Sequence, residues 1–435
     1  MYFFNVVLGL SQIFLIGYIL ISEVENKSPV AFLWATLFIM FGLPHSVTAL
    51  LGDVDYASNV IMQASIFVCG FCLIYMLCRM KKRVPFVKLI AESKFEIEPS
   101  KINNSLFEYI CLTIFVVSIV GYIINIIHSQ GGIFNTSWGG GREIHTSYVS
   151  ILGIANRLIF TFSGLSLFYF LTKRKGRALI VLSLFALLVL ITRNRVQVLP
   201  ILIFVISLVL IRINRLRVKY VIIGVVLAAG IIYIVYALRA FRYLGSLSDA
   251  FSNFSWEYIN ETILNFLKSN NGELGLRRGF YYFIQENNNF EGFNKGYTYI
   301  RMLLVYLPSQ WSIGMKPQSF DLYMGQAMGM ISGGSAHPTL FGDCFGNLYW
   351  FGILLGGFWA FLANFIDKLI CFQKENFFKI MIFFLASYFF VVSGRGSVYN
   401  GFETFAWGVL FLYLFKKISP NLIRTHLKFI NVIVR

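Results

Sequence analysis

One stretch of the chain joins a polar, glycine-rich segment to a long apolar one: Gly333-Gly334-Ser335-Ala336-His337-Pro338-Thr339-Leu340-Phe341-Gly342-Asp343. Pro338 has no N–H and suits the first position of a helix, while the residue before a proline favours extended backbone. The stretch therefore predicts a loop that ends at His337 and a helix that starts at Pro338. Asp343 is expected in the second turn of this helix, with Thr339 and Asn347 one turn away on the same face.

The same stretch carries candidate chemistry. An ionisable side chain inside an apolar helix is costly to bury, so Asp343 is a candidate functional residue. The free N–H groups at a helix start favour an anion nearby. His337, Asp343 and this helix start fall within seven residues of one another. Gly342-x3-Gly346 and Gly352-x3-Gly356 follow and predict close helix packing rather than chemistry.

The composition around this stretch is that of a membrane protein. Of 435 residues, 57% are hydrophobic and 13% are charged, whereas soluble domains carry about 25% charged residues. Apolar runs of roughly 15 to 25 residues fit membrane-spanning helices. They predict an all-α polytopic membrane protein with about eleven transmembrane helices, near 2–22, 30–51, 57–78, 106–128, 150–172, 178–192, 196–211, 220–238, 341–366, 377–392 and 402–415.

Basic clusters orient these helices, because cytoplasmic loops carry an excess of Lys and Arg. The clusters at 79–83, 173–177, 212–219 and 416–417 fall on one side, which we interpret as cytoplasmic. Three parts follow from this topology. Residues 1–238 hold the first eight helices, 239–340 form a large periplasmic loop with short interfacial or re-entrant helices, and 341–435 hold the last three helices and a cytoplasmic tail.

Arginine dominates the outer side of this topology, whereas lysine dominates the inner side. The planar guanidinium binds phosphate bidentately, and lysine acts as a point charge. The bias therefore predicts an outward-facing site for a phosphate or pyrophosphate ligand, although any one arginine can instead pair with an acid or a lipid headgroup. The candidate pyrophosphate- or sugar-binding residues are Arg142, Arg193, Arg195, Arg239, Arg242, Arg278, Arg301 and Arg395.

The sequence gives little indication of a metal site or a nucleotide-binding site. Asp53-Val-Asp55 matches the D-x-D pattern that holds a divalent metal in some glycosyltransferases, but two acids in a short loop are more often solvent-facing charges. There is no P-loop and no convincing dinucleotide fingerprint. We therefore expect no metal, no other cofactor, no nucleotide-activated cytoplasmic substrate and no nucleic-acid partner.

Several motifs occur in order along the second half of the chain: Gly296-Tyr-Thr-Tyr299, Leu307-Pro308-Ser-Gln-Trp311, Lys316-Pro317, Gly333-Gly334-Ser335, Pro338-Thr339, Gly342-Asp343, Gly346-Asn347 and Gly352. Together they resemble the Wzy-type O-antigen (oligosaccharide repeat unit) polymerases, most strongly over 296–357. Two positions depart from the family pattern. Ser309-Gln310 follow Pro308 where the family often shows Pro-Arg, and Asp343 stands where Glu is common.

The resemblance implies a GT-C-like, metal-independent enzyme of the bacterial inner membrane. It would transfer a growing glycan from undecaprenyl pyrophosphate onto an incoming lipid-linked repeat unit at the periplasmic face. The arginines would hold the donor pyrophosphate, and His337 or Asp343 would accept the proton of the attacking hydroxyl. A histidine pKa near 6.5 favours His337 as that base. Asp343 would then orient it or bind sugar, and the alternative for His337 is a helix cap.

Other functions stay open on the sequence alone. An O-antigen ligase, or another polyprenyl-linked sugar transferase, uses the same kind of donor. A lipid-linked oligosaccharide transporter is a third interpretation, but it should line a cavity with charge along many helices, and here charge collects at the outer surface. Expected partners are undecaprenyl-pyrophosphate-linked oligosaccharides and the lipid bilayer, with a chain-length regulator as a further candidate.

Overall fold

The computed structural model describes residues 2–53, 55–80, 104–130, 151–172, 174–192, 199–212, 230, 233, 237, 247–252, 255–268, 275–307, 314–330, 335–373 and 376–433. Every regular element in these ranges is a helix, and the described residues contain no strand. The prediction of an all-α chain is confirmed for the described residues. The chain divides into two compact units, each built from segments that are far apart in sequence.

Six helical segments are long and apolar enough to cross a membrane: Phe3–Glu25, Ala31–Leu51, Ser58–Arg79, Leu106–Ile124, Thr339–Cys371 and Phe377–Gly394. Arg157–Phe170 forms a shorter apolar helix. The run expected near 220–238 lies outside the described residues, apart from single positions. The structure therefore supports a membrane protein, while the count of about eleven spans stays a prediction.

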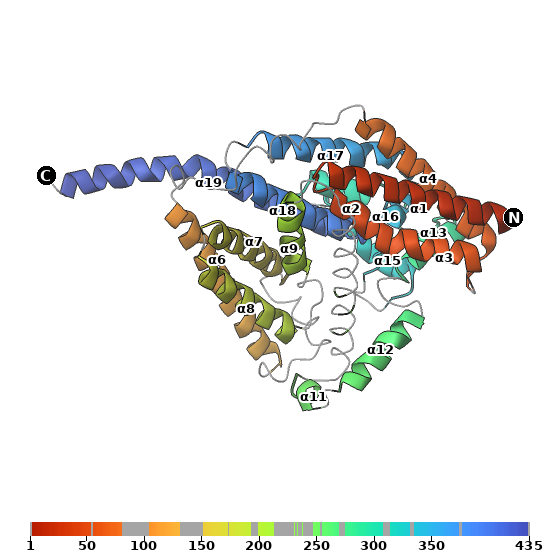
Figure 1. Cartoon of the computed structure of the whole chain (residues 1–435), viewed down its shortest axis with the longest axis horizontal. Helices are drawn as coiled ribbons and strands as arrows, with labels where there is room; N and C mark the ends of the chain where they lie inside the picture. The colour runs from red at the N-terminus through yellow and green to blue at the C-terminus, as the bar shows by residue number, and fades with distance from the viewer. Residues whose placement is uncertain are drawn as a thin grey trace. The chain divides into compact units, whose positions relative to one another are not determined.

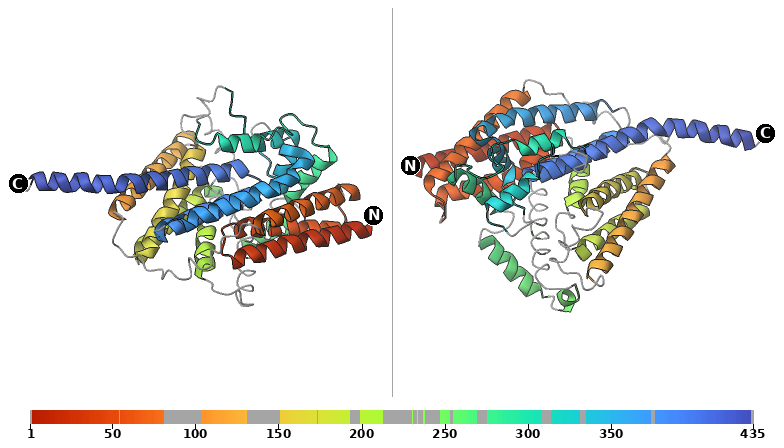
Figure 2. Two further views of the ribbon diagram at one scale, coloured as in Figure 1. Left: turned by 90° about the horizontal axis from the view of Figure 1, so that it is seen from above. Right: turned by 180° about the vertical axis from the view of Figure 1, so that it is seen from behind.

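The first unit comprises Met1–Glu92, Leu267–Gln373 and Leu385–Trp407. In Figure 1, α1 lies beside α2, α3 and α4, and Figure 2 shows the same helices side by side from two further directions. Its helices are α1 (Tyr2–Glu25), α2 (Ala31–Leu37), the π-helical turn Phe38–Gly42, α3 (Leu43–Leu51), α4 (Ser58–Met80), α13 (Arg277–Gln285), α14 (Tyr297–Leu303), α15 (Phe320–Ala327), α16 (Thr339–Leu348), the 3-10 turn Tyr349–Leu354, α17 (Leu355–Cys371) and parts of α18 (Asn376–Gly394) and α19 (Val398–Ile433).

The second unit comprises Ser93–Phe266, Lys374–Phe384 and Gly408–Arg435. Its helices are α6 (Asn104–Gln130), α7 (Ile151–Leu171), α8 (Lys175–Thr192), α9 (Leu199–Arg212), α11 (Leu247–Ser252), α12 (Trp256–Lys268) and the remaining parts of α18 and α19. Within this unit α7 packs on both α6 and α8.

Glycines allow the closest helix approaches in the first unit, as their spacing predicts. A Cβ added at Gly352 would lie 2.4 Å from the carbonyl oxygen of Cys344, and one at Gly356 would lie 2.4 Å from that of Phe71. These distances are shorter than any van der Waals contact between the atoms. The glycines therefore bring α17 and the 3-10 turn before it directly against α4 and α16.

A buried ionic cluster joins α1, α4 and α17 in the same unit. The guanidinium of Arg79 donates from Nε and Nη2 to the two carboxylate oxygens of Glu23, each at 2.9 Å, and it also contacts Asp367 and Asn364. Arg79 is 2% exposed and Glu23 is fully buried. Breaking a buried ion pair is strongly destabilising, so this cluster fixes how the three helices meet.

Replacing Arg79 with lysine is expected to lower the free energy of unfolding by about 1–3 kcal/mol, because an ammonium cannot reproduce the forked bonds and leaves buried oxygens unsatisfied. Thermal unfolding in detergent measures this. Arg174→Lys is the matched control, since Arg174 pairs with Glu108 at an exposed position. A surface pair is worth only about 0–1 kcal/mol. Equal melting temperatures for the two variants would contradict the structural role of the cluster.

Candidate functional site

The loop before α16 is anchored at both ends within the first unit. Helix α16 begins at Thr339, one residue later than predicted, and Pro338 stands at its N-cap position with φ −85° and ψ 30° but without a side-chain hydrogen bond to the helix. The N–H of Ala336 donates to the carbonyl of Asp321 on α15 at 3.1 Å, and the N–H of Thr339 donates to the carbonyl of Arg395 at 3.2 Å. These two bonds hold the segment that carries His337 between α15 and the turn that joins α18 to α19.

Thr339 adopts a left-handed backbone, with φ 66°. This conformation is an outlier for a β-branched residue and costs on the order of 1–3 kcal/mol, a strain that clusters at functional sites. Gly396 faces it, since a Cβ at Gly396 would lie 2.8 Å from the Thr339 nitrogen. The N–H of Thr339 bonds the Arg395 carbonyl, a contact between distant parts of the chain that a proline rule applied to the sequence alone cannot foresee.

His337 is half-buried, and its Nε2 lies 3.5 Å from the hydroxyl of Ser335. The imidazole therefore stands in the anchored loop and not inside α16. Loop residues held by a rigid scaffold are the usual place for catalytic side chains.

Asp343 is buried, with 3% of its surface exposed, in a polar cluster that ties α16 to α14. The Thr298 hydroxyl donates to Asp343 Oδ2, and the Asn347 amide donates to Asp343 Oδ1, both at 3.2 Å. The Thr298 N–H in turn donates to Asn347 Oδ1 at 3.0 Å. The predicted pairing of Asp343 with Asn347 one turn away is confirmed. The buried Thr339 hydroxyl, the other expected neighbour, has no hydrogen-bond partner among the described residues.

Two cations converge on one tyrosine at the start of α19. The Arg301 guanidinium lies 4.3 Å from the centroid of the Tyr399 ring, and its Nη1 donates to the Pro317 carbonyl at 2.6 Å. The Lys316 ammonium lies 5.5 Å from the same ring centroid. The Tyr399 hydroxyl donates to Glu403 at 3.2 Å. Among the described residues of this cluster, two positive groups face one carboxylate, so their summed charge is positive.

The electrostatic field of this cluster acts on Lys316. Burial lowers the pKa of the Lys316 ammonium, and the positive charge of Arg301 lowers it further, while Glu403 acts in the opposite sense. Two like charges held close together repel each other, and an anion placed between them would relieve that repulsion.

The arginines of α13 already have protein partners. Arg278 forms ion pairs with Asp53, at 3.3 Å, and with Asp55, and Arg277 donates to the Thr48 hydroxyl at 3.0 Å. Both acids of the D-x-D pattern therefore face a guanidinium. Among the described residues, no group of three or more His, Cys, Asp or Glu side chains is arranged to hold a metal ion.

Only some of the arginines predicted to bind pyrophosphate or sugar lie in the part of the chain that the structure describes. Arg301 lies in the cationic cluster, Arg278 pairs with two acids, and Arg395 contributes its carbonyl to the anchored loop. Five predicted residues lie outside the described part of the chain: Arg142, Arg193, Arg195, Arg239 and Arg242.

Three residues of the cluster were missed as site residues by sequence reasoning. Lys316 belongs to the Lys316-Pro317 motif, so that motif was the available signal. Tyr399 and Glu403 are four residues apart and share a helix face, but nothing in the sequence links them to Arg301. Comparison with known proteins adds no family assignment: no protein-family model, no curated protein and no solved structure matches this chain.

Proposed function

We propose that this chain is an O-antigen polymerase. It transfers the growing glycan from undecaprenyl pyrophosphate onto an incoming lipid-linked repeat unit at the outer face of the bacterial inner membrane. The observation that supports the proposal is the cationic cluster, in which Arg301 and Lys316 converge on Tyr399 with Glu403 as the neighbouring carboxylate. The order of motifs along 296–357 supports the same assignment.

The cluster suits a pyrophosphate leaving group. As the glycosidic bond to the pyrophosphate breaks, negative charge grows on the departing oxygen. Fixed donors aimed at developing charge lower the barrier without having to reorganise. Arg301 is fixed in this way, by the Pro317 carbonyl on one nitrogen and by the Tyr399 ring on its face.

His337 is the proposed general base. It accepts the proton of the acceptor hydroxyl while that oxygen attacks the anomeric carbon of the donor sugar. An ordinary histidine pKa near 6.5 suits this role at neutral pH. The loop of His337 and the cationic cluster meet at the turn between α18 and α19, because the Arg395 carbonyl accepts from the Thr339 N–H and Tyr399 follows Arg395 by four residues, at the start of α19.

Asp343 is the proposed positioning residue. Its carboxylate accepts from Thr298, and Arg301 follows Thr298 by one turn of α14. The cluster of Asp343, Asn347 and Thr298 therefore sets the orientation of the helix that presents Arg301. We favour His337 over Asp343 as the proton acceptor because the Asp343 carboxylate is buried and bonded to Thr298 and Asn347, whereas His337 is half-buried in the loop before α16.

A deletion strain tests the function. Loss of this chain is expected to leave lipopolysaccharide with a core and a single repeat unit, because a separate ligase still transfers single units. The measurement is the ladder of lipopolysaccharide on a gel, with the plasmid-borne gene restoring long chains. Bare core with lipid-linked polymer accumulating would assign the chain as the ligase. Long ladders that persist in the deletion strain would contradict both enzymes.

A further inference from the structure

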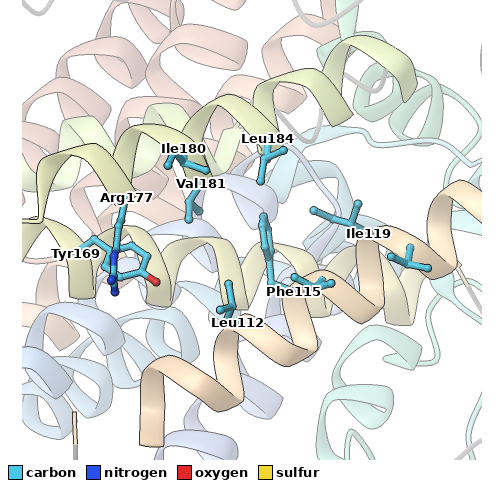
Figure 3. A pocket seen from close by; sticks show the side chains of 10 residues that line it. Leu112, Phe115, Ile119, Tyr169, Arg177, Ile180, Val181 and Leu184 are labelled. Atoms are coloured by element: carbon cyan, nitrogen blue, oxygen red, sulfur yellow. The ribbon is translucent and has the colours of Figure 1, made fainter. Parts of the chain in front are cut away.

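An apolar groove lies on the second unit and shares no residue with the site of the proposed function. It has a volume of about 250 Å³ and is lined by α6, α7 and α8. Figure 3 shows Phe115 and Ile119 from α6 facing Val181 and Leu184 from α8, with Tyr169 and Arg177 together at one end. The groove is therefore apolar along its length and polar at one end.

The polar end carries excess positive charge. Glu108 accepts hydrogen bonds from Arg177 at 2.7 Å, from Arg174 at 3.0 Å and from the Tyr169 hydroxyl at 2.9 Å. One carboxylate thus faces two guanidinium groups, and Lys175 follows in the chain. The Arg174 and Arg177 side chains are 47% and 57% exposed. Both can therefore bind a further anion without breaking their hydrogen bonds to Glu108.

Several side chains that line the groove are exposed at the surface. Val116 on α6 is 48% exposed, and Ile180 and Leu184 on α8 are 61% and 44% exposed. The α6 segment is one of those apolar enough to cross a membrane. In a bilayer such walls face lipid tails, and the sequence places the basic cluster 173–177 at the cytoplasmic surface.

We propose that this groove binds an anionic phospholipid, with an acyl chain along the apolar walls and the headgroup phosphate on Arg174 and Arg177. The net positive charge favours a headgroup that has no positive charge of its own to cancel the phosphate. Basic pockets between membrane helices bind anionic lipid headgroups in the same way. The apolar walls select a lipid over free phosphate. The inference depends on the membrane setting but not on the proposed enzyme activity, and it concerns only residues of the second unit.

Binding of fluorescent phosphatidylglycerol to the delipidated full chain in detergent tests the proposal. The wild-type chain is expected to bind it about tenfold or more tightly than phosphatidylcholine with the same acyl chains. The double variant Arg174→Gln/Arg177→Gln is expected to lose this preference. Arg157→Gln, an exposed cation on α7 that does not line the groove, is the matched control and should keep it.

A second pair of variants tests the acyl-chain site. Val116→Trp fills part of the groove and should weaken phosphatidylglycerol binding about tenfold, which corresponds to losing the burial of about two methylene groups of the acyl chain. Val117→Trp, on the neighbouring exposed position outside the groove, should bind as wild type. Equal binding of the two lipids, equal binding by the two tryptophan variants, or competition by inorganic phosphate as effective as by unlabelled phosphatidylglycerol would each overturn the proposal.

Discussion

Replacing His337 with asparagine is expected to slow glycan polymerisation by about 10²–10⁴-fold, the range that a positioned general base contributes. Asparagine can still cap a helix and donate a hydrogen bond, but it cannot accept a proton at neutral pH. The variant therefore separates the base from a structural cap. The measurement is the rate of polymer formation by the purified chain in vesicles that contain lipid-linked repeat units, at equal protein levels.

The matched variant for this experiment is Asp343→Asn. If Asp343 only positions α14, this change weakens the bond to Thr298 and reduces polymerisation less than His337→Asn does. Both proteins should still bind the lipid-linked donor. Full activity of His337→Asn together with an inactive Asp343→Asn would assign the proton transfer to Asp343 and leave His337 as a cap.

Replacing Arg301 with glutamine is expected to lower the polymerisation rate by about 10²–10³-fold, the usual cost of removing one fixed donor to a charge that develops in the transition state. The effect should appear in kcat, because the contact strengthens as the pyrophosphate departs. Arg301→Lys retains the charge but loses the forked geometry, so it should recover only part of the rate. The same vesicle assay measures both variants.

Arg278→Gln is the matched control for Arg301. Arg278 also lies in the segment between α12 and α16, but its guanidinium already pairs with Asp53 and Asp55. Its loss should reduce stability more than turnover. A fall in rate for Arg278→Gln that equals or exceeds that for Arg301→Gln would place the pyrophosphate at α13 instead of α14 and would contradict the cationic cluster as the site.

The sequence predicts helices well where the signal is local. Apolar runs identify the six helical segments able to cross a membrane, because a spanning helix needs a continuous apolar stretch of known length. The spacing of Gly352 and Gly356 correctly indicates close packing. Asn347 is correctly placed beside Asp343, since the two are one helical turn apart.

The sequence fails where a contact joins distant parts of the chain. The N–H of Thr339, at the start of α16, bonds the carbonyl of Arg395, and the partners of Arg278 lie in the loop after α3. The stacking of Arg301 on Tyr399 joins residues about a hundred positions apart. Periodicity and spacing carry no information about such pairs, so the arginine bias indicates a ligand class but not which arginine already has a carboxylate partner.

Polymer formation by the purified chain is the most direct test of the proposed polymerase activity. The protein is placed in vesicles with undecaprenyl-pyrophosphate-linked repeat units and excess chelator, and the lipid-linked products are separated by size. We expect a ladder of products that grows by whole repeat units, with free undecaprenyl pyrophosphate released at each transfer. Repeat units that remain single in a folded, donor-binding protein, with or without added magnesium or manganese, would contradict the claim.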